Sequence, residues 1–474
     1  MALVKPHEPF SQKNRHAAPL VRSLASFPSL DQLYEEGKSL RNKCSRQSHA
    51  VWKVPRNRPD PVSLLEKSSK GRIPRLVPIR YGRMMQSPFT FYRGAALNMA
   101  HDLAHTPGTG LHVQACGDSH LLNFGFFATP ERLESFDIND LDETLPAPWE
   151  WDVKRLAASF VLACRSNGFS EQCARDAAVY CARSYRERMA EFSQMPVLDV
   201  WYTHIDLQDL IPKIEDEQTR KRLQKRMAAA RKSSALEHDF PKLAEVVGQL
   251  PRIKDNPPLI YHWREGDEEF SAGVHAAFAN YRETLQENRR LLLDRYQLRD
   301  IAIKVVGVGS VGTWCGIALL LASARDPLFL QIKEARESVL EFYAGKSAFR
   351  NHGQRVVNGY RLMQSASDLF LGWCVGPAGR HFYVRQLRDM KIKLLVEVFR
   401  PATMMRYAEL CGWTLAKAHA RSGEPSRISG YLGKSDKFDK AVGDFSVAYA
   451  DQSERDHKVF LKAVREGRIE VEKE

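Results

Sequence analysis

The sequence predicts an α+β fold with two lobes. Helical patterns dominate before residue 297 and after residue 400, a strand-rich stretch with a glycine loop lies between them, and 474 residues exceed what one hydrophobic core usually takes. We expect an N-terminal extension over 1–80, the first part of a helical large lobe over 81–297, a small β-rich lobe over 298–390 and the remaining large-lobe helices over 391–474.

Charge and composition narrow the class of protein. The net charge of +13 favours an anionic partner such as a nucleotide, a nucleic acid or a phosphorylated metabolite. The densest basic run, 220–232, is interpreted as a solvated helix face, because no aromatic residue interleaves it as base stacking would require. Nucleic acid is therefore the less favoured partner.

The cysteines and the apolar runs indicate a location. Eight cysteines are scattered without any CxxC spacing, which argues against a zinc site and fits a reducing cytoplasm. No apolar run approaches the roughly 18 residues of a membrane span. The N-terminus has no continuous apolar signal core, so we expect a cytoplasmic protein without a membrane span; its oligomeric state is left open.

The elements before residue 200 follow from capping and periodicity. Ser87 and Pro88 open a helix expected over 84–105, and residues 111–116 alternate like a strand. That strand leads into CGDSHLLNFG, 116–125. A short hairpin arm follows at 131–138, then an acidic loop, and then helices at 151–168, 170–193 and 215–236.

In the second half of the chain the predicted elements change from helices to strands and then back to helices. Residues 268–297 read as helical, and strands are expected at 301–306, 313–322 and 327–335. We expect a helix pair over 335–368, a hairpin made of 370–376 and 380–387, and a clear helix over 407–423.

The first chemical constellation combines CGDSHLLNFG with FDIND. Asp118, Asn123 and Asp137 follow two strand–loop junctions, and hard oxygen ligands of this kind suit Mg²⁺ that also binds substrate phosphates. Asp118 could accept a proton from an attacking hydroxyl. Asp140 and Asp142 are reserve metal ligands. The alternative is a pair of Asx turns that cap strand ends.

The second constellation is VVGVGSVGTWC, 305–315. Gly307, Gly309 and Gly312, with Ser310 between them, form a GxGxxG pattern that fits a Rossmann turn, a phosphate loop of the kinase type or an ordinary hairpin. A Rossmann loop must lead into a helix, whereas TWCGIALLLA reads as a returning strand. The kinase-type loop, whose backbone N–H groups approach phosphate, is therefore favoured over a Rossmann oxidoreductase.

The third constellation is Lys333 in LFLQIKEA. A lysine among apolar neighbours is costly unless it is paired, and in a kinase-type lobe it holds the α- and β-phosphates beside a helix glutamate. Glu337 and Glu341 are the candidates for that glutamate. Strand alternation places Phe329, Gln331 and Lys333 on one face; the alternative is an exposed strand lysine.

A resemblance adds to this set of phosphoryl-transfer parts. GDSHLLNFG resembles the HGDxHxxN catalytic loop of aminoglycoside-phosphotransferase-like kinases, with Cys116 in place of the first histidine, and FDIND resembles their metal-binding strand. The resemblance implies that Asp118 is the catalytic base, that Asn123 and Asp137 bind metal, that His120 supports the loop and that Asp152 of WEWDVKRLAASF is structural.

The order of the parts is reversed. The glycine loop and Lys333 follow the catalytic loop, and YAELCGWTLAKAHARSG, which resembles the helix that normally precedes that loop, lies near the C-terminus. This implies a circularly permuted protein-kinase-like fold. From about residue 80 to 465 the chain also resembles one bacterial family, domain-of-unknown-function family 2252 (DUF2252), through stretches such as SPFTFYRGAA, VVGVGSVGT and RLMQSASDLFLGW.

The sequence thus predicts an ATP- and Mg²⁺-dependent phosphotransferase that acts on an unidentified hydroxyl acceptor. Tyr383–Leu387 is expected to be the hinge strand that meets adenine, with Arg385 as a nucleotide contact, and Arg93 is expected either to face the cleft or to form an ordinary salt bridge. The alternatives are a pseudokinase or an AMP transferase on the same fold, and, third, a nucleic-acid-binding protein.

Overall fold

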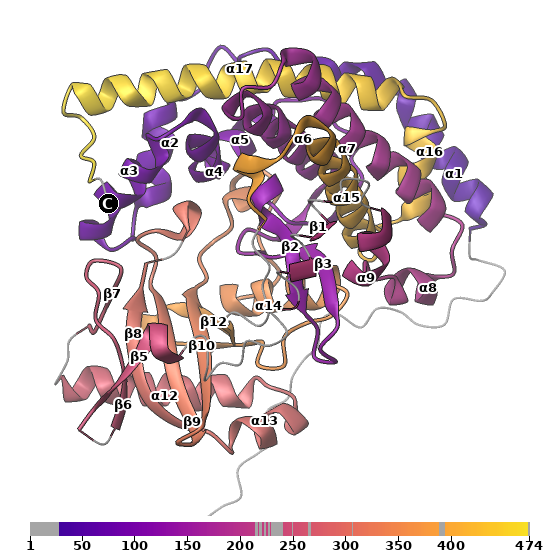
Figure 1. Ribbon diagram of the computed structural model, residues 1–474. Helices are drawn as coiled ribbons and strands as arrows, with labels where there is room; N and C mark the ends of the chain where they lie inside the picture. The colour runs from indigo at the N-terminus through magenta and orange to yellow at the C-terminus, as the bar shows by residue number, and fades with distance from the viewer. Residues whose placement is uncertain are drawn as a thin grey trace, which may run out of the picture.

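The computed structural model describes residues 28–213, 217, 220–221, 224–225, 228, 240–248, 250–263, 267–305, 307–387 and 394–472 (Figure 1). It has the predicted α+β composition. The first 27 residues and most of the basic helix expected over 215–236 lie outside this described part. Within it, no helix is both long and apolar enough to cross a membrane.

The helical part is built around α6 (Trp149–Ser166), whose residues from Trp149 to Cys164 are all buried. Helices α7 (Glu171–Phe192), α15 (Pro401–Ala420) and α17 (Lys437–Arg465) pack against it, and α17 runs along the outside of this part (Figure 1). Burial of α6 includes four charged residues, and the helix can hold them because each has a polar partner.

Residues 30–103, part of which we expected to be an extension, add helices to this part. They form α1 (Leu30–Ser39), α2 (Pro61–Ser69), α3 (Val77–Met84), α4 (Pro88–Gly94) and α5 (Ala96–Leu103). The helix expected over 84–105 is therefore two helices, separated at Ala95, although Ser87 caps the first as predicted.

Two glycines bring α1 against α16 (Pro425–Leu432). A Cβ on Gly37 would lie 1.9 Å from the Arg427 carbonyl oxygen, and a Cβ on Gly430 would lie 2.0 Å from the Tyr34 carbonyl oxygen. Only glycine fits at either position, so this contact ties the N-terminal helix to a helix near the other end of the chain.

The sheet part is a six-stranded antiparallel sheet with the order β11-β12-β10-β9-β8-β7 (Figure 1). Its strands are β7 (Ile260–Tyr261), β8 (Gln297–Lys304), β9 (Cys315–Ser323), β10 (Asp326–Glu334), β11 (Gly372–Val375) and β12 (His381–Gln386). The returning strand after the glycine loop and the hairpin before residue 390 are therefore confirmed.

The two faces of β10 differ as the alternation predicts. Leu328 and Leu330 pack with α12 (Glu268–Glu283) and α13 (Glu287–Leu293), whereas Phe329 packs on the other face with the hairpin of β5 (Ala244–Val247) and β6 (Leu250–Ile253). The short helix α11 (Phe240–Leu243) leads into this hairpin.

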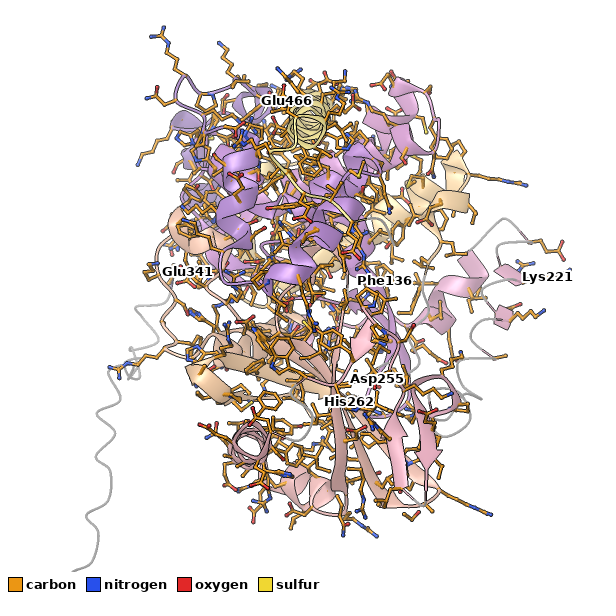
Figure 2. All side chains as sticks on the ribbon, turned by 90° about the vertical axis from the view of Figure 1, so that its left-hand side faces the viewer. Phe136, Lys221, Asp255, His262, Glu341 and Glu466 are labelled. Atoms are coloured by element: carbon orange, nitrogen blue, oxygen red, sulfur yellow. The ribbon has the colours of Figure 1, made fainter. Side chains whose placement is uncertain are left out.

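Polar contacts fasten the β5–β6 hairpin to the sheet. Ile253 N donates to Asp300 Oδ2 of β8 at 2.6 Å. The His262 ring, next to β7, lies between Asp255 Oδ1 at 2.9 Å and Asp300 Oδ2 at 3.1 Å (Figure 2). The hairpin thus covers the face of the sheet to which Lys333 belongs.

Short elements join the two parts. β1 (His112–Ala115) pairs with β4 (Leu145–Pro148), β2 (Phe124–Ala128) pairs with β3 (Glu134–Ile138), and α14 (His352–Met363) lies beside them (Figure 1). In place of the helix pair expected over 335–368, α14 follows a 3-10 turn at Val339–Phe342. Two further short helices in the described part are α8 (Val197–Tyr202) and α9 (Leu207–Leu210).

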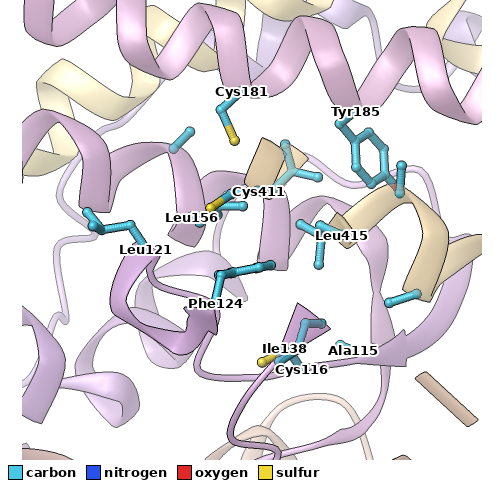
Figure 3. Packing of buried hydrophobic residues seen from close by; sticks show 14 of the residues in the cluster. Ala115, Cys116, Leu121, Phe124, Ile138, Leu156, Cys181, Tyr185, Cys411 and Leu415 are labelled. Atoms are coloured by element: carbon cyan, nitrogen blue, oxygen red, sulfur yellow. The ribbon is translucent and has the colours of Figure 1, made fainter. Parts of the chain in front are cut away.

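The hydrophobic core anchors the CGDSHLLNFG loop. Leu121 and Phe124 lie in the same cluster as Leu156 of α6 and Leu415 of α15 (Figure 3). The Tyr407 hydroxyl donates to the carbonyl oxygens of Leu121 and Phe124 at 2.7 and 3.0 Å. The loop therefore has a rigid base from which its polar side chains project.

Candidate functional site

The start of α6 shapes the loop that carries Asp118. The backbone N–H groups of Cys116 and Gly117 donate to the Asp152 carboxylate at 2.5 and 3.0 Å. Gly117 has a φ of +82°, a conformation that favours glycine. His419 of α15 lies 3.1 Å from the same carboxylate, so Asp152 has the structural position that the resemblance implied.

Arg155, also on α6, holds Asp118 directly. Its Nε donates to Asp118 Oδ1 at 2.9 Å, and its Nη2 donates to the same oxygen. Burial would raise the pKa of Asp118, but the positive charge of Arg155 outweighs that effect and the pKa lies below its ordinary value. Asp118 is therefore ionised at neutral pH, with Oδ2 outside the hydrogen bonds to Arg155.

His120 stands next to that second oxygen. Its Nε2 lies 3.9 Å from Asp118 Oδ2, and its Nδ1 is buried without a hydrogen-bond partner in the described part of the chain. Burial lowers the pKa of His120 to about 4, with Arg93 acting in the same direction and Asp118 against it. The imidazole is thus neutral at pH 7.

The glycine loop between β8 and β9 is anchored to the N-terminal helices. Val308 packs in a cluster with Met84 and Phe91, and Val311 packs with Ile73 and Leu76. Ile73 N donates to the carbonyl oxygen of Gly312 at 2.6 Å. The loop is therefore held from the helical part as well as from the sheet.

This anchoring brings the glycine loop onto Asp118. A Cβ on Gly309 would lie 3.8 Å from Asp118 Oδ2 and 3.8 Å from the Arg93 carbonyl oxygen. Around Gly307 a Cβ would meet nothing within 4 Å. Ser310 Oγ donates to Asp142 Oδ2 at 3.3 Å, so the loop contacts both acidic segments.

Lys333 is buried between two carboxylates. Its Nζ lies 2.8 Å from both oxygens of Asp140 and 2.7 Å from Asp142 Oδ2, and the Tyr383 hydroxyl also donates to Asp142. Burial would lower the pKa of Lys333, but the two aspartates outweigh burial and raise it. Burial and the nearby Asp140 raise the pKa of Asp142.

Arg385 and Tyr360 form the next layer. Arg385 Nη1 donates to the Asn139 carbonyl oxygen at 2.8 Å and to the Tyr360 hydroxyl at 2.6 Å. That hydroxyl lies 3.3 Å from Asp140 Oδ1. Arg385 is therefore one residue removed from the Lys333 cluster.

Asn123 connects the two acidic segments. Its Nδ2 donates to the carbonyl oxygen of Asp140 at 2.7 Å and to that of Asp118 at 3.2 Å. The side-chain oxygen is the group that could face a metal ion. Asn123 thus fixes the distance between the loop of Asp118 and the loop of Asp140.

Asp137 lies apart from this cluster. It is fully buried, and its carboxylate accepts hydrogen bonds from Ser365 N at 2.9 Å, from Ile138 N at 3.0 Å and from Lys417 Nζ. These contacts occupy both oxygens. The carboxylates that reach Lys333 are those of Asp140 and Asp142, whereas Asp137 pairs with Lys417, and its metal role stays a prediction.

The two glutamates expected beside Lys333 contact other groups in the structure. Glu337 pairs with Lys346 at the surface, and Glu341 accepts from the backbone N–H groups of Ser338 and Ser347 at 3.1 Å each. Glu341 caps its own short turn. Helix α14 contributes Tyr360 instead of a carboxylate to this cluster.

The backbone of the expected hinge strand is largely occupied. β12 lies between β10 and β11, and Gln386 N and Leu387 N donate to Asp368 Oδ2 and to the Phe329 carbonyl oxygen, both within the sheet part. Residues 388–393, which follow this strand, lie outside the described part of the chain.

Reasoning from the sequence missed Arg155. A signal was present, since Arg155 lies three residues after Asp152 in a helix that is otherwise apolar enough to be buried. For Arg93 the sequence left two alternatives open, a position facing the cleft and an ordinary salt bridge. Its Nε is buried without a hydrogen-bond partner among the described residues, and its charge lowers the pKa of Asp118.

The donor set suits a metal ion that arrives with phosphates. In the described ranges, no three His, Cys, Asp or Glu side chains gather to hold a metal ion by themselves. Asp140 and Asp142 are adjacent carboxylates, and Asn123 adds an amide oxygen. Mg²⁺ usually takes one or two carboxylates and completes its shell with water and phosphate oxygens, so these residues fit it.

Comparison with known proteins places the chain in a family. No curated protein and no solved structure matches it. A family model described as an uncharacterized protein conserved in bacteria matches residues 72–463, which include the Asp118 loop, the glycine loop and Lys333. The chain therefore belongs to the DUF2252 family.

Proposed function

We propose that this protein is an ATP- and Mg²⁺-dependent phosphotransferase with a two-lobed, circularly permuted kinase-like fold, acting on a hydroxyl acceptor, with a small molecule favoured. One observation carries the proposal. The glycine hairpin lies against Asp118, and the strand lysine, Lys333, meets Asp140 and Asp142, although these groups are about 190 residues apart in the chain. A phosphate-binding loop, a lysine, a base and metal ligands are the parts that phosphoryl transfer needs.

The permutation has its own support. The end of α15 lies beside β1, where Gln114 N donates to Ser422 Oγ at 3.0 Å across 308 positions of sequence. In a kinase of ordinary order, the equivalent helix would run directly into the catalytic loop. Here the chain does not connect α15 to β1, but the two elements still lie side by side, as a permutation of the chain would require.

The proposed roles follow from the contacts. Arg155 holds Asp118 Oδ1, so Oδ2 is the oxygen that would accept the acceptor's hydroxyl proton while the acceptor oxygen bonds the γ-phosphorus and ADP leaves with the bridging oxygen. Neutral His120 would border the acceptor. Lys333 would exchange its aspartate partners for phosphate oxygens, and Mg²⁺, held by Asp140, Asp142 and Asn123, would neutralise phosphate charge.

The first experiment separates binding from chemistry. Mg·ATP should raise the melting temperature of the wild type and of Asp118→Asn, but should have little effect on Lys333→Met, because that variant loses the phosphate contact. Glu337→Gln changes a glutamate that the sequence predicted as a partner of Lys333 but that pairs with Lys346. It is the matched control and should behave like the wild type. Absence of any Mg·ATP shift in the wild type would refute the nucleotide site.

The second experiment identifies the transferred group. Metabolite extracts are incubated with ATP labelled at the α- or the γ-phosphate, and products are compared between the wild type and Asp118→Asn. We expect only the γ-label to reach an acceptor, with a rate about 10²–10⁴-fold lower for the variant. Transfer of the α-label would instead establish AMP transfer.

A further inference from the structure

A cavity lies behind the Lys333 cluster. Its volume is about 340 Å³, and it is bordered by the β2–β3 turn, α13, the beginning of β10 and the segment between α14 and β11. Asp118, Gly309 and Lys333 are not among the residues that line it. Cavities that hold small organic ligands begin at about 300 Å³, so this one is large enough for a compact ligand.

Apolar and polar side chains contribute about equally to the walls of the cavity. Phe127, Leu328 and Phe370 line it, and Leu328 and Phe370 are buried. A ring packed against these three side chains gains by removing apolar surface from water, and the polar share of the wall suits a polar or charged substituent on that ring.

Arg385 supplies a positive group on the lining. Its Nε donates a hydrogen bond to Gln331 Oε1 at 3.0 Å, and its Nη1 donates to the Asn139 carbonyl oxygen and the Tyr360 hydroxyl. Its Nη2 makes no hydrogen bond with the described residues. A partly buried guanidinium with free N–H groups is a ready partner for an anion.

The carboxylates on the lining are already engaged. Asp368 accepts from the backbone N–H groups of Phe370 and Gln386 at 2.6 and 2.5 Å. Asp326 is exposed, and the Tyr296 hydroxyl donates to it at 3.3 Å. Neither competes with a ligand for Arg385 in the contacts described above.

We propose that this cavity binds a small aromatic anion, and that a ligand there opposes nucleotide binding at Lys333; the second half rests on the proposed function. The link is short. Arg385 contacts Asn139 and Tyr360, and Tyr360 contacts Asp140, which holds Lys333. An anion on Arg385 would cancel positive charge next to the cluster that must receive phosphates, so the two ligands should weaken each other.

The test uses 8-anilinonaphthalene-1-sulfonate, a fluorescent aromatic anion, on the full chain. We expect saturable binding to the wild type, competition by indole-3-acetate, and at least about tenfold weaker binding by Ala128→Trp, which fills the cavity, and by Arg385→Gln. Val197→Trp places the same ring on an exposed helix, where Val197 is 74% accessible, and should bind the probe like the wild type.

The coupling is measured in the same titration. Saturating Mg·ATP should weaken probe binding about fivefold, and saturating probe should weaken Mg·ATP binding by the same factor, because linkage is reciprocal. Equal probe affinity for the wild type and Ala128→Trp would overturn the cavity site. Unchanged probe affinity with bound Mg·ATP would overturn the coupling. If Mg·ATP does not bind at all, the proposed function and the coupling both fail, while the cavity site is still decided by the two variants.

Discussion

The guanidinium of Arg155 approaches Asp118 from one side only. Its Nε lies 2.9 Å from Oδ1, while Oδ2 faces Gly309 and His120. A buried arginine therefore does two things to this carboxylate. It holds the side chain in one orientation, and it leaves Oδ2 outside its hydrogen bonds.

Replacing Arg155 by Met should raise the pKa of Asp118, because the positive charge that most strongly opposes the burial effect is removed. The direct measurement is ¹³C NMR of the carboxyl signal, assigned by its loss in Asp118→Asn. Arg165→Met, in the same helix but paired with surface acids, is the control and should leave that signal unchanged.

Activity should follow the same shift. A base works only when it is ionised, so the acid limb of the pH–rate profile should move to higher pH in Arg155→Met and stay in place in Arg165→Met. If the carboxyl signal and the acid limb are the same in the wild type and Arg155→Met, Arg155 does not control Asp118.

Asp142→Asn should tighten the binding of ATP without Mg²⁺. In the wild type both Asp140 and Asp142 hold Lys333, and both repel phosphate. Removing one charge should improve ATP binding about fivefold in the presence of EDTA, which corresponds to about 1 kcal/mol, and should reduce the further gain from Mg²⁺. Isothermal titration calorimetry with and without Mg²⁺ measures both effects, with Glu337→Gln as the control.

Much of this arrangement was predictable from the sequence, and the exceptions have physical causes. The glycine loop, Lys333 and the Asp118 loop carry their chemistry in local patterns. Asp137 and Asp140 are three residues apart, and the choice between them depends on burial. All five residues of β3 are buried, so alternation does not mark which side Asp137 faces. Its partner, Lys417, lies 280 positions away, where no local pattern announces it.

His120 should make the folded state sensitive to acid. Its pKa is about 4 in the folded protein and about 6.5 when unfolded. Above pH 6.5 both states are neutral and His120 contributes nothing to the pH dependence. As the pH falls from 6.5 to 4, only the unfolded state takes up the proton, so the free energy of unfolding decreases by up to about 3 kcal/mol.

Urea unfolding of the wild type and His120→Gln at pH 7.0, 5.5 and 4.5 tests this. Other buried histidines, such as His49, contribute to both proteins, so the difference between the two curves is the relevant quantity. The variant should lose less stability than the wild type between pH 7.0 and 4.5. If the free energy of unfolding falls equally with pH in the two proteins, His120 accepts a proton in the folded state and the prediction is wrong.

Loss of the Asp137–Lys417 pair should lower the free energy of unfolding and should not change nucleotide binding. Both side chains are fully buried. Removing one partner leaves an uncompensated charge, so Asp137→Ala should cost about 3–5 kcal/mol in the free energy of unfolding. Asp451→Ala removes a surface partner of Arg165, where Asp451 is 47% accessible, and should cost less than about 1 kcal/mol.

The double variant Asp137→Leu/Lys417→Met distinguishes a structural pair from a metal ligand. Because it removes both charges and keeps apolar volume, it should recover much of the stability that Asp137→Ala loses. It should also keep the Mg²⁺ dependence of ATP binding, since Asp140 and Asp142 remain. If the double variant folds well but no longer responds to Mg²⁺, Asp137 is a metal ligand after all, and the role assigned to Asp140 and Asp142 is wrong.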